Sequence, residues 1–210
     1  HQLRTPLAVL RTQLQSAQRG DVAPAQALQE MSGTVERATQ LANQMLALAK
    51  VEQLRRQGEA PVVDWADIVR AVALDLAPLI AEAQLDFDIH TQPAPVRAHE
   101  WALRELTRNL LHNAVKHSAV GGRLGVQLAR QAQQATLRIS DSGPGISAEL
   151  RRRLFQPFAS GDPRSGSGLG LAICHEIVDT LAGEIRLDNR AQGGLDAVIG
   201  LPLADNAAHE

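Results

Sequence analysis

An apolar repeat with spacings of three and four residues runs through the first 49 residues, and few folds other than paired helices accommodate it. The repeat is interrupted near Gly20 and Pro24 and then resumes. The pattern predicts two helices joined by a short loop, with one heptad-like seam along them. The seam residues are Leu3, Leu7, Leu10, Leu14 and Ala17, followed by Leu28, Met31, Val35, Ala38, Ala42, Met45 and Leu48 or Ala49.

A helical hairpin of this size buries too little apolar surface to be stable alone. We expect it to pair with a second copy of the chain and form a four-helix bundle, which predicts a homodimer. The alternative is that the two helices pack on the remainder of their own chain.

A polar stretch, RRQGEAP over residues 55–61, separates the hairpin from a different pattern in which helical and strand periodicities are mixed. These periodicities predict an α+β protein: a hairpin over 1–57, a linker over 58–62, a two-layer α/β sandwich over 63–204 and a tail over 205–210. The predicted helices cover 64–83 (with Asp64 as the cap), 99–117 and 167–181, and the predicted strands cover 85–90, 124–129, 136–140, 184–187 and 195–201.

Composition narrows the function classes. Aromatic residues make up only 2% of the chain, so the core must be built from Leu, Ala, Val and Ile. A formal charge of −2 gives no basic surface for nucleic acid. The single cysteine, Cys174, excludes an internal disulfide, and its apolar surroundings predict core packing. No apolar run reaches the roughly 18 residues of a membrane span. The first residue is His1, which predicts a fragment of a longer protein.

Polar side chains recur every fourth residue in the predicted helix 99–117. Glu105, Asn109, Asn113 and His117 therefore share one face, beside an apolar face. Asparagine is a poor helix former, so two asparagines would weaken a helix whose polar face only contacts water. They suit a site where side-chain oxygens meet a metal or a nucleotide, because Mg²⁺ takes oxygen ligands and needs few from protein. A solvated helix face is the alternative.

Two glycine-rich turns follow. In DSGPGI, Asp141 ends a strand and Gly143 and Gly145 let a ligand approach the backbone closely. In RSGSGLGLAI, three glycines precede an apolar helix, whose amino-terminal N–H groups form a natural phosphate site. The second turn lacks the Gly-Lys-Ser/Thr ending of a P-loop and does not follow a strand in a βαβ unit. Each turn alone is a weak signal.

The order of these segments carries the resemblance. ELTRNLLHNAVKHS resembles the N box of sensor histidine kinases of two-component systems, DSGPGI the G1 box, LFQPF the F box and GSGLGLAI the G2 box. HQLRTPL at the front resembles the H box, so the likeness extends from His1 to about Leu203. The resemblance implies a dimerisation and histidine-phosphotransfer hairpin followed by an ATP-binding domain of the Bergerat fold, with a lid between the G1 and G2 boxes.

The resemblance also implies roles for the first residues. His1 becomes the acceptor of the γ-phosphoryl group, since a neutral imidazole carries a lone pair. Pro6 predicts a kink between Gln2 and Pro6. Thr5 is expected to orient the water that dephosphorylates the partner; its other reading is a hydroxyl bonded to its own helix. Gln2 departs from the acidic residue common at this position and cannot act as a base at pH 7.

The remaining implied roles concern Mg²⁺ and ATP. Asn113 is the expected Mg²⁺ ligand, with Asn109 at phosphate or its water, Lys116 at phosphate and His117 over the nucleotide. Asp141 is expected to hold the adenine amino group. Phe155 and Phe158 anchor the lid, and Glu105 is either a water-orienting base or a polar helix residue. The full set expected at the nucleotide is Asn109, Asn113, Lys116, His117, Asp141, Gly143, Gly145, Ile146, Phe158, Arg164, Gly166, Ser167, Gly168, Leu169, Gly170 and Leu171.

The expected function is therefore autophosphorylation on His1 and phosphotransfer to an aspartate of a response-regulator receiver domain, with phosphatase activity on that regulator. Other Bergerat ATPases remain as an alternative, but they lack a hairpin that carries HQLRTP. A nucleotide-binding scaffold or a phosphatase-only protein is the third possibility, which Gln2 keeps open. We expect this fragment to be cytoplasmic and the full-length protein to be anchored in the bacterial inner membrane.

Overall fold

The computed structural model describes residues 4–54, 59–156 and 168–204. Among these residues, no helix combines the length and the apolar character needed to cross a membrane. Several predictions fall outside the described residues: the phosphoacceptor His1, Gln2 and the kink it would share with Pro6, and the nucleotide contacts of Phe158, Arg164, Gly166 and Ser167.

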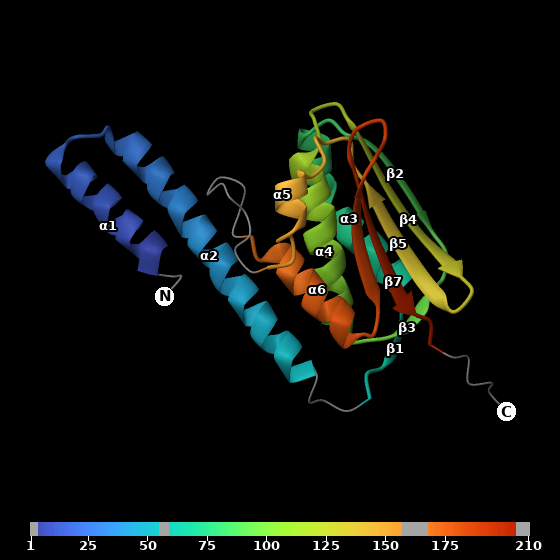
Figure 1. Cartoon of the computed structure of the whole chain (residues 1–210). Helices are drawn as coiled ribbons and strands as arrows, with labels where there is room; N and C mark the ends of the chain where they lie inside the picture. Colours follow the sequence, from blue (N-terminus) through green and yellow to red (C-terminus); the bar gives the residue numbers. More distant parts are fainter. Residues whose placement is uncertain (1–3, 55–58, 157–167, 205–210) are drawn as a thin grey trace.

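The amino-terminal part is the predicted hairpin. Helix α1 (Arg4–Arg19) lies antiparallel to the first half of the long helix α2 (Pro24–Leu54) (Figure 1). The turn between them contains Gly20 at φ +77°, a left-handed conformation that favours glycine. Pro24 begins α2, where its missing N–H has no helical partner to lose.

The heptad-like seam is not buried by this single chain. Leu7, Leu14, Leu28, Val35 and Met45 are between 41% and 66% exposed. Side chains outside the seam, Ala27 and Thr34, are the buried ones in the first half of α2. The alternative in which the helices pack on their own chain therefore holds only at the end of the seam, where Leu48 packs against the apolar core, while these five residues stay open to solvent.

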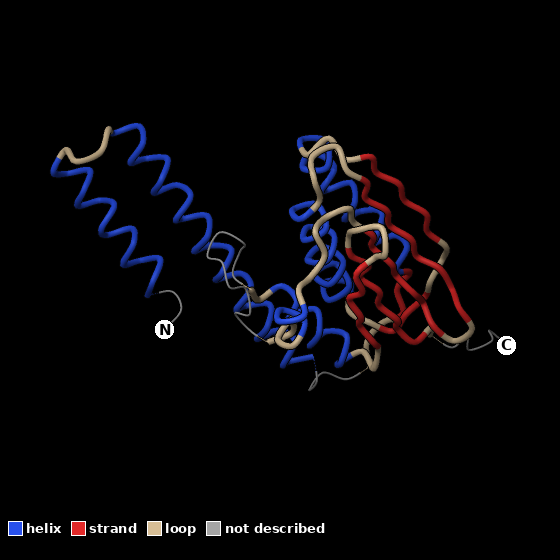
Figure 2. The backbone as a smooth tube through the Cα atoms, turned by 45° about the horizontal axis from the view of Figure 1, so that its top comes forward, coloured by secondary structure: helices blue, strands red, loops and turns tan. Residues whose placement is uncertain are grey.

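The second part is a two-layer sandwich. Its five-stranded sheet has the order β2-β4-β5-β7-β6, in which β2 pairs with β4 in parallel and the other pairs are antiparallel. Three helices cover one face of the sheet (Figures 1 and 2). The bounds are β2 Asp86–Thr91, β4 Arg123–Gln131, β5 Gln134–Ser140, β6 Glu184–Asn189 and β7 Leu195–Pro202, with α3 Trp65–Glu82, α4 Glu100–His117 and α6 Gly170–Thr180.

The sandwich core lies between the helices and the sheet. Trp65 is fully buried in it, and its indole N–H donates to the Thr107 hydroxyl at 3.1 Å, which joins α3 to α4. Cys174 of α6 is also fully buried, and burial raises the pKa of its thiol, which confirms core packing. Asp64 caps α3 as predicted: its Oδ1 accepts from the N–H of Ala66 at 3.0 Å and of Ala94 at 2.8 Å.

Three short elements were not predicted. Strands β1 (Val62–Asp64) and β3 (Pro95–Arg97) form a separate two-stranded sheet, and α5 (Ala148–Arg151) follows the first glycine turn. Three or four residues are too few for a periodic pattern to be recognised. Val62, the last residue of the predicted linker, therefore already belongs to a strand.

The predicted start of the last helix was wrong. Helix α6 begins at Gly170 and not at Ser167, because Gly168 has φ +67° and cannot continue a right-handed helix. The other predicted helices and strands are present, with ends shifted by a few residues.

The end of α2 belongs to the core of the sandwich. Ala47, Val51 and Leu54 are buried in the same apolar cluster as α3, α4 and α6. The Lys50 ammonium lies 5.9 Å from the centre of the Trp101 ring at the start of α4, a cation–π geometry. The hairpin and the sandwich are thus joined by packing as well as by the chain.

Candidate nucleotide-binding site

The polar face predicted on α4 is present. Glu105, Asn109 and Asn113 are half-buried, while Lys116 and His117 are exposed at the end of the helix. The Asn109 side-chain amide donates to Glu105 twice, to the carboxylate Oε1 and to the backbone oxygen, both at 3.0 Å. Two residues of this face, Glu105 and Asn109, are therefore joined to each other by hydrogen bonds.

The start of α6 lies against this stripe. A Cβ placed on Gly170 would sit 3.2 Å from Asn109 Oδ1, so the glycine allows the two helices to approach closely at this point. The structure thus brings together Asn109 and the amino terminus of α6, both of which the sequence analysis expected to contact the bound nucleotide. Leu169 is fully buried and Leu171 half-buried, so at Leu169 only the backbone can face a ligand.

Asp141 follows strand β5 and is 5% exposed. Its Oδ1 accepts from the N–H of Gly143 at 2.8 Å and from the N–H of Leu195 at 3.1 Å. Its backbone oxygen accepts from Arg190 Nη1 at 3.1 Å. One carboxylate oxygen therefore fixes the turn and the start of β7, and the carboxylate is held rigidly at the end of the sheet.

The glycines around Asp141 also have a packing role that the sequence did not reveal. A Cβ on Gly143 would lie 2.4 Å from the backbone oxygen of His117. A Cβ on Gly194, which has φ +100°, would lie 2.0 Å from the backbone oxygen of Asp141. The turn can contact the end of α4 and the β6–β7 connection only because these positions lack side chains.

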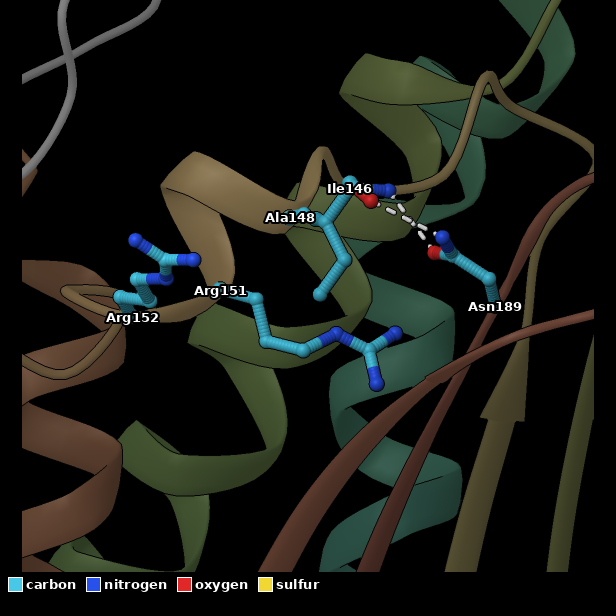
Figure 3. Close-up of a pocket in the computed structure, with 5 residues that line it drawn as sticks. All are labelled: Ile146, Ala148, Arg151, Arg152 and Asn189. Carbon is cyan, nitrogen blue, oxygen red and sulfur yellow. Dashed lines mark hydrogen bonds between the residues drawn. The ribbon is translucent and has the colours of Figure 1, made fainter.

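Asn189 is a residue that the sequence reasoning missed. Its Oδ1 accepts from the Ile146 N–H and its Nδ2 donates to the Ile146 oxygen, both at 2.8 Å (Figure 3). The amide thus pairs with the backbone of the turn as a neighbouring strand would. Gly145, at φ +73°, leaves room for it, since a Cβ there would lie 2.7 Å from Asn189 Oδ1.

A pocket of about 480 Å³ opens beside this turn (Figure 3). It shares Ile146 with the predicted nucleotide set. Its other lining residues are Ala148, Asn189 and the two arginines Arg151 and Arg152. The run of three arginines in RRRLF was the signal available in the sequence, but a charge run by itself predicts only a solvated segment.

Phe155 packs where the resemblance expected a lid anchor. Its ring centre lies 5.0 Å from that of His175 on α6, and the side chain contacts the apolar core. The segment after it, which carries the other residues expected in the lid, lies outside the described residues.

The donor set suits magnesium. Within residues 4–54, 59–156 and 168–204, no three His, Cys, Asp or Glu side chains are grouped to hold a metal ion. Mg²⁺ does not require such a cage, because it keeps several waters and binds through one or two protein oxygens and substrate phosphates. The amide oxygens of Asn109 and Asn113, one turn apart on α4, fit this requirement.

Two histidines on α4 have lowered pKa values. Partial burial and then the Lys116 ammonium lower the pKa of His117, while Asp141 acts against this shift. Partial burial, Lys116, Arg108 and His117 lower the pKa of His112. Both rings are therefore neutral at pH 7. In the unfolded chain both imidazoles regain their ordinary pKa of about 6.5 and bind protons more readily than in the folded protein. Their contribution to stability is therefore present above about pH 6.5 and is lost as the pH falls below it.

We expect Lys116→Met to raise the pKa of both His112 and His117, because it removes a cation that disfavours the imidazolium form. Titration of the ring resonances by NMR measures the shift. Arg130→Met, on the exposed end of β4, is the matched control and should leave both midpoints in place. Unchanged midpoints in Lys116→Met would show that the Lys116 ammonium does not set the two values.

The sequence and the fold of the chain match known proteins. Residues 98–205 match the family described as "Histidine kinase-, DNA gyrase B-, and HSP90-like ATPase", and residues 1–54 match the "His Kinase A (phospho-acceptor) domain". The chain therefore belongs to the sensor histidine kinases of bacterial two-component systems.

Individual relatives agree with this family. Sensor protein kinase PmrB of Pseudomonas aeruginosa is 33% identical over 208 residues, which cover 96% of this chain and 44% of PmrB. The signal transduction histidine-protein kinase/phosphatase MprB of Mycobacterium ulcerans is 34% identical over 203 residues, covering 92% of this chain and 40% of MprB. The solved structure of the Acinetobacter baumannii histidine kinase AdeS superposes with a TM-score of 0.79 at 26% identity and covers 98% of both chains. The chain spans less than half the length of these two curated relatives.

Proposed function

We propose that this chain is the catalytic core of a sensor histidine kinase that uses ATP to phosphorylate His1 and then passes the phosphoryl group to a response regulator. The observation that carries the proposal is the contact between the asparagine stripe of α4 and the amino terminus of α6 at Gly170. It joins two segments, about 60 residues apart in the sequence, that the proposal assigns to one nucleotide site.

The transfer forms one bond and breaks one. A ring nitrogen of His1 attacks the γ-phosphorus, the bond to the β–γ bridging oxygen breaks, ADP leaves, and the imidazole proton passes to solvent. An aspartate of the receiver domain then takes the phosphoryl group and frees the imidazole. Such transfers depend mainly on positioning and charge neutralisation. Gln2 cannot remove the proton, so we expect Gln2→Glu to change the autophosphorylation rate.

The residues of the sandwich have binding roles in this proposal. Bound Mg²⁺ would neutralise phosphate charge, and Asn113 and Asn109 would hold it. Lys116 would contact phosphate and Asp141 the adenine amino group, with Ile146 and His117 alongside. The amino terminus of α6, from Gly168 to Leu171, would face the phosphates through its backbone. The roles of Phe158, Arg164, Gly166 and Ser167 stay predictions.

Phosphatase activity is part of the proposal. Its support is the similarity to MprB, a histidine-protein kinase/phosphatase, together with Thr5, which is exposed on α1. Thr5 would orient the water that attacks the regulator's aspartyl phosphate. We also propose that residues 1–57 form the phosphotransfer hairpin and 63–204 the ATP-binding domain. The full-length protein would be anchored in the inner membrane, with this part in the cytoplasm.

A labelling assay tests the kinase activity. Incubation with γ-labelled ATP and Mg²⁺ should give acid-labile, base-stable label on the wild type and none on His1→Ala. Adding a receiver domain should move the label to it. Tight nucleotide binding without label would instead support the nucleotide-binding scaffold or phosphatase-only alternative.

The exposed seam supports a homodimer. We expect Leu28→Glu to weaken self-association by at least about tenfold, because Leu28 is 66% exposed on the seam and a charge there would be buried in a bundle. Sedimentation equilibrium measures the dissociation constant. Gln29→Glu, an exposed neighbour off the seam, adds the same charge and should leave self-association unchanged. Equal dissociation constants for the two variants would contradict the four-helix bundle.

A further inference from the structure

Glu105 lies one turn before Asn109 on α4, and its side chain is half-buried. Its carboxylate Oε1 accepts from Asn109 Nδ2 at 3.0 Å, and its backbone oxygen accepts from the same Nδ2 at 3.0 Å. Both partners of this amide nitrogen are acceptors. Glu105 is therefore engaged with the neighbouring asparagine and not only with solvent.

This pair of bonds fixes which way the Asn109 carboxamide faces. An asparagine can rotate its oxygen and nitrogen into each other's places, and only its partners decide between the two orientations. Neither oxygen of Glu105 that contacts Asn109 can donate while the carboxylate is ionised, so Nδ2 must face Glu105. The carboxamide oxygen, Oδ1, then faces the start of α6, where it lies 3.2 Å from the position of a Cβ on Gly170.

The orientation decides what Asn109 can bind. An amide nitrogen turned toward α6 would offer a donor, which suits phosphate and repels a cation. An amide oxygen offers an acceptor, which suits Mg²⁺ or a water bound to it. We propose that Glu105 is a positioning residue that holds Asn109 Oδ1 toward the cation of the magnesium nucleotide, and not a water-orienting base. This inference rests on the proposed function.

Nucleotide affinity, and not turnover, tests this role of Glu105. Binding of a non-hydrolysable ATP analogue is followed by calorimetry, once with saturating Mg²⁺ and once with EDTA. Glu105→Ala should weaken binding in Mg²⁺ by roughly 10- to 100-fold, the usual effect of removing a group that orients a metal ligand. Binding in EDTA should stay within about twofold of wild type, since the phosphate contacts do not depend on Asn109 Oδ1.

Two further variants sharpen the result. Glu105→Gln should retain most of the affinity in Mg²⁺, because its amide oxygen can still accept from Asn109 Nδ2. Glu105→Met keeps the length of the side chain and its helix propensity but removes the acceptor, so it should behave as Ala does. Glu105→Met therefore tests the positioning role even if Glu105→Ala does not fold. Glu100→Ala, whose carboxylate lies 3.8 Å from Arg104 on the same helix, is the matched control and should bind as wild type.

Each other outcome overturns the proposal in a distinct way. Equal losses in Mg²⁺ and EDTA would make Glu105 a structural residue only, and so would wild-type affinity in Glu105→Met. If Glu105→Gln binds the magnesium nucleotide normally but is no longer phosphorylated, Glu105 acts as a base. If the wild type itself binds no nucleotide, the proposed function fails and this inference with it.

Discussion

Asp141→Asn should remove nucleotide binding while leaving the fold intact. Asp141 Oδ1 already accepts from the N–H groups of Gly143 and Leu195, and an asparagine oxygen can keep both bonds. The asparagine nitrogen must then occupy the place of the second carboxylate oxygen, which we assign to the adenine amino group. Two donors would face each other there. We expect affinity to fall by about 100-fold or more, because an unpaired buried donor adds its own penalty to the lost bond.

Asp141→Ala separates the two roles. It leaves the N–H groups of Gly143 and Leu195 without their acceptor, so it should lower the free energy of unfolding by about 2–4 kcal/mol. Calorimetric titration gives the affinities and urea unfolding gives the stabilities. Asp88→Asn, on the exposed side of β2, controls for the loss of one charge and should change neither quantity. An Asp141→Asn protein that still binds ATP tightly would exclude Asp141 as the adenine contact.

Gly194→Ala should be the most destabilising of these changes. Its methyl group would lie 2.0 Å from the backbone oxygen of Asp141, and φ +100° is strained for any residue with a Cβ. The turn would have to move away from β7. We expect the free energy of unfolding to fall by about 3–5 kcal/mol and nucleotide binding to be lost with it.

The adjacent glycine is a matched control for this variant. Gly193 also has a positive φ, +89°, but no atom lies within 4 Å of a Cβ placed on it. Gly193→Ala should therefore lose only about 1–2 kcal/mol, the cost of the backbone conformation alone. Denaturant unfolding of both variants measures the difference. Equal losses would mean that the contact with Asp141 has no energetic importance.

Periodicity in the sequence predicted the main elements because it depends on neighbours along the chain. The Asp64 cap, the polar face of α4 and the five strands of the large sheet were all accessible in this way. Strands β1 and β3 could not be predicted in this way, since each has only three residues and is recognised by its pairing with the other strand. The same holds for Asn189, whose amide bonds a backbone 43 residues away.

The glycines show the same limit within the site. The sequence predicted that Gly143 makes room for a ligand, a role that stays a prediction. The structure adds a reason that no local pattern contains, since the atom that excludes a side chain at Gly143 is the backbone oxygen of His117. Contacts between distant segments decide which glycine is indispensable.

The buried end of α2 has a consequence for any attempt to isolate the ATP-binding part. Ala47, Val51 and Leu54 are buried in the apolar cluster of the sandwich, and α2 contacts α6. A truncated protein beginning at Glu59 would expose that apolar surface, so it should melt at a lower temperature and aggregate more readily than the intact chain. We therefore expect the last turns of a helix that the sequence assigns to the other domain to add to the stability of the nucleotide-binding part.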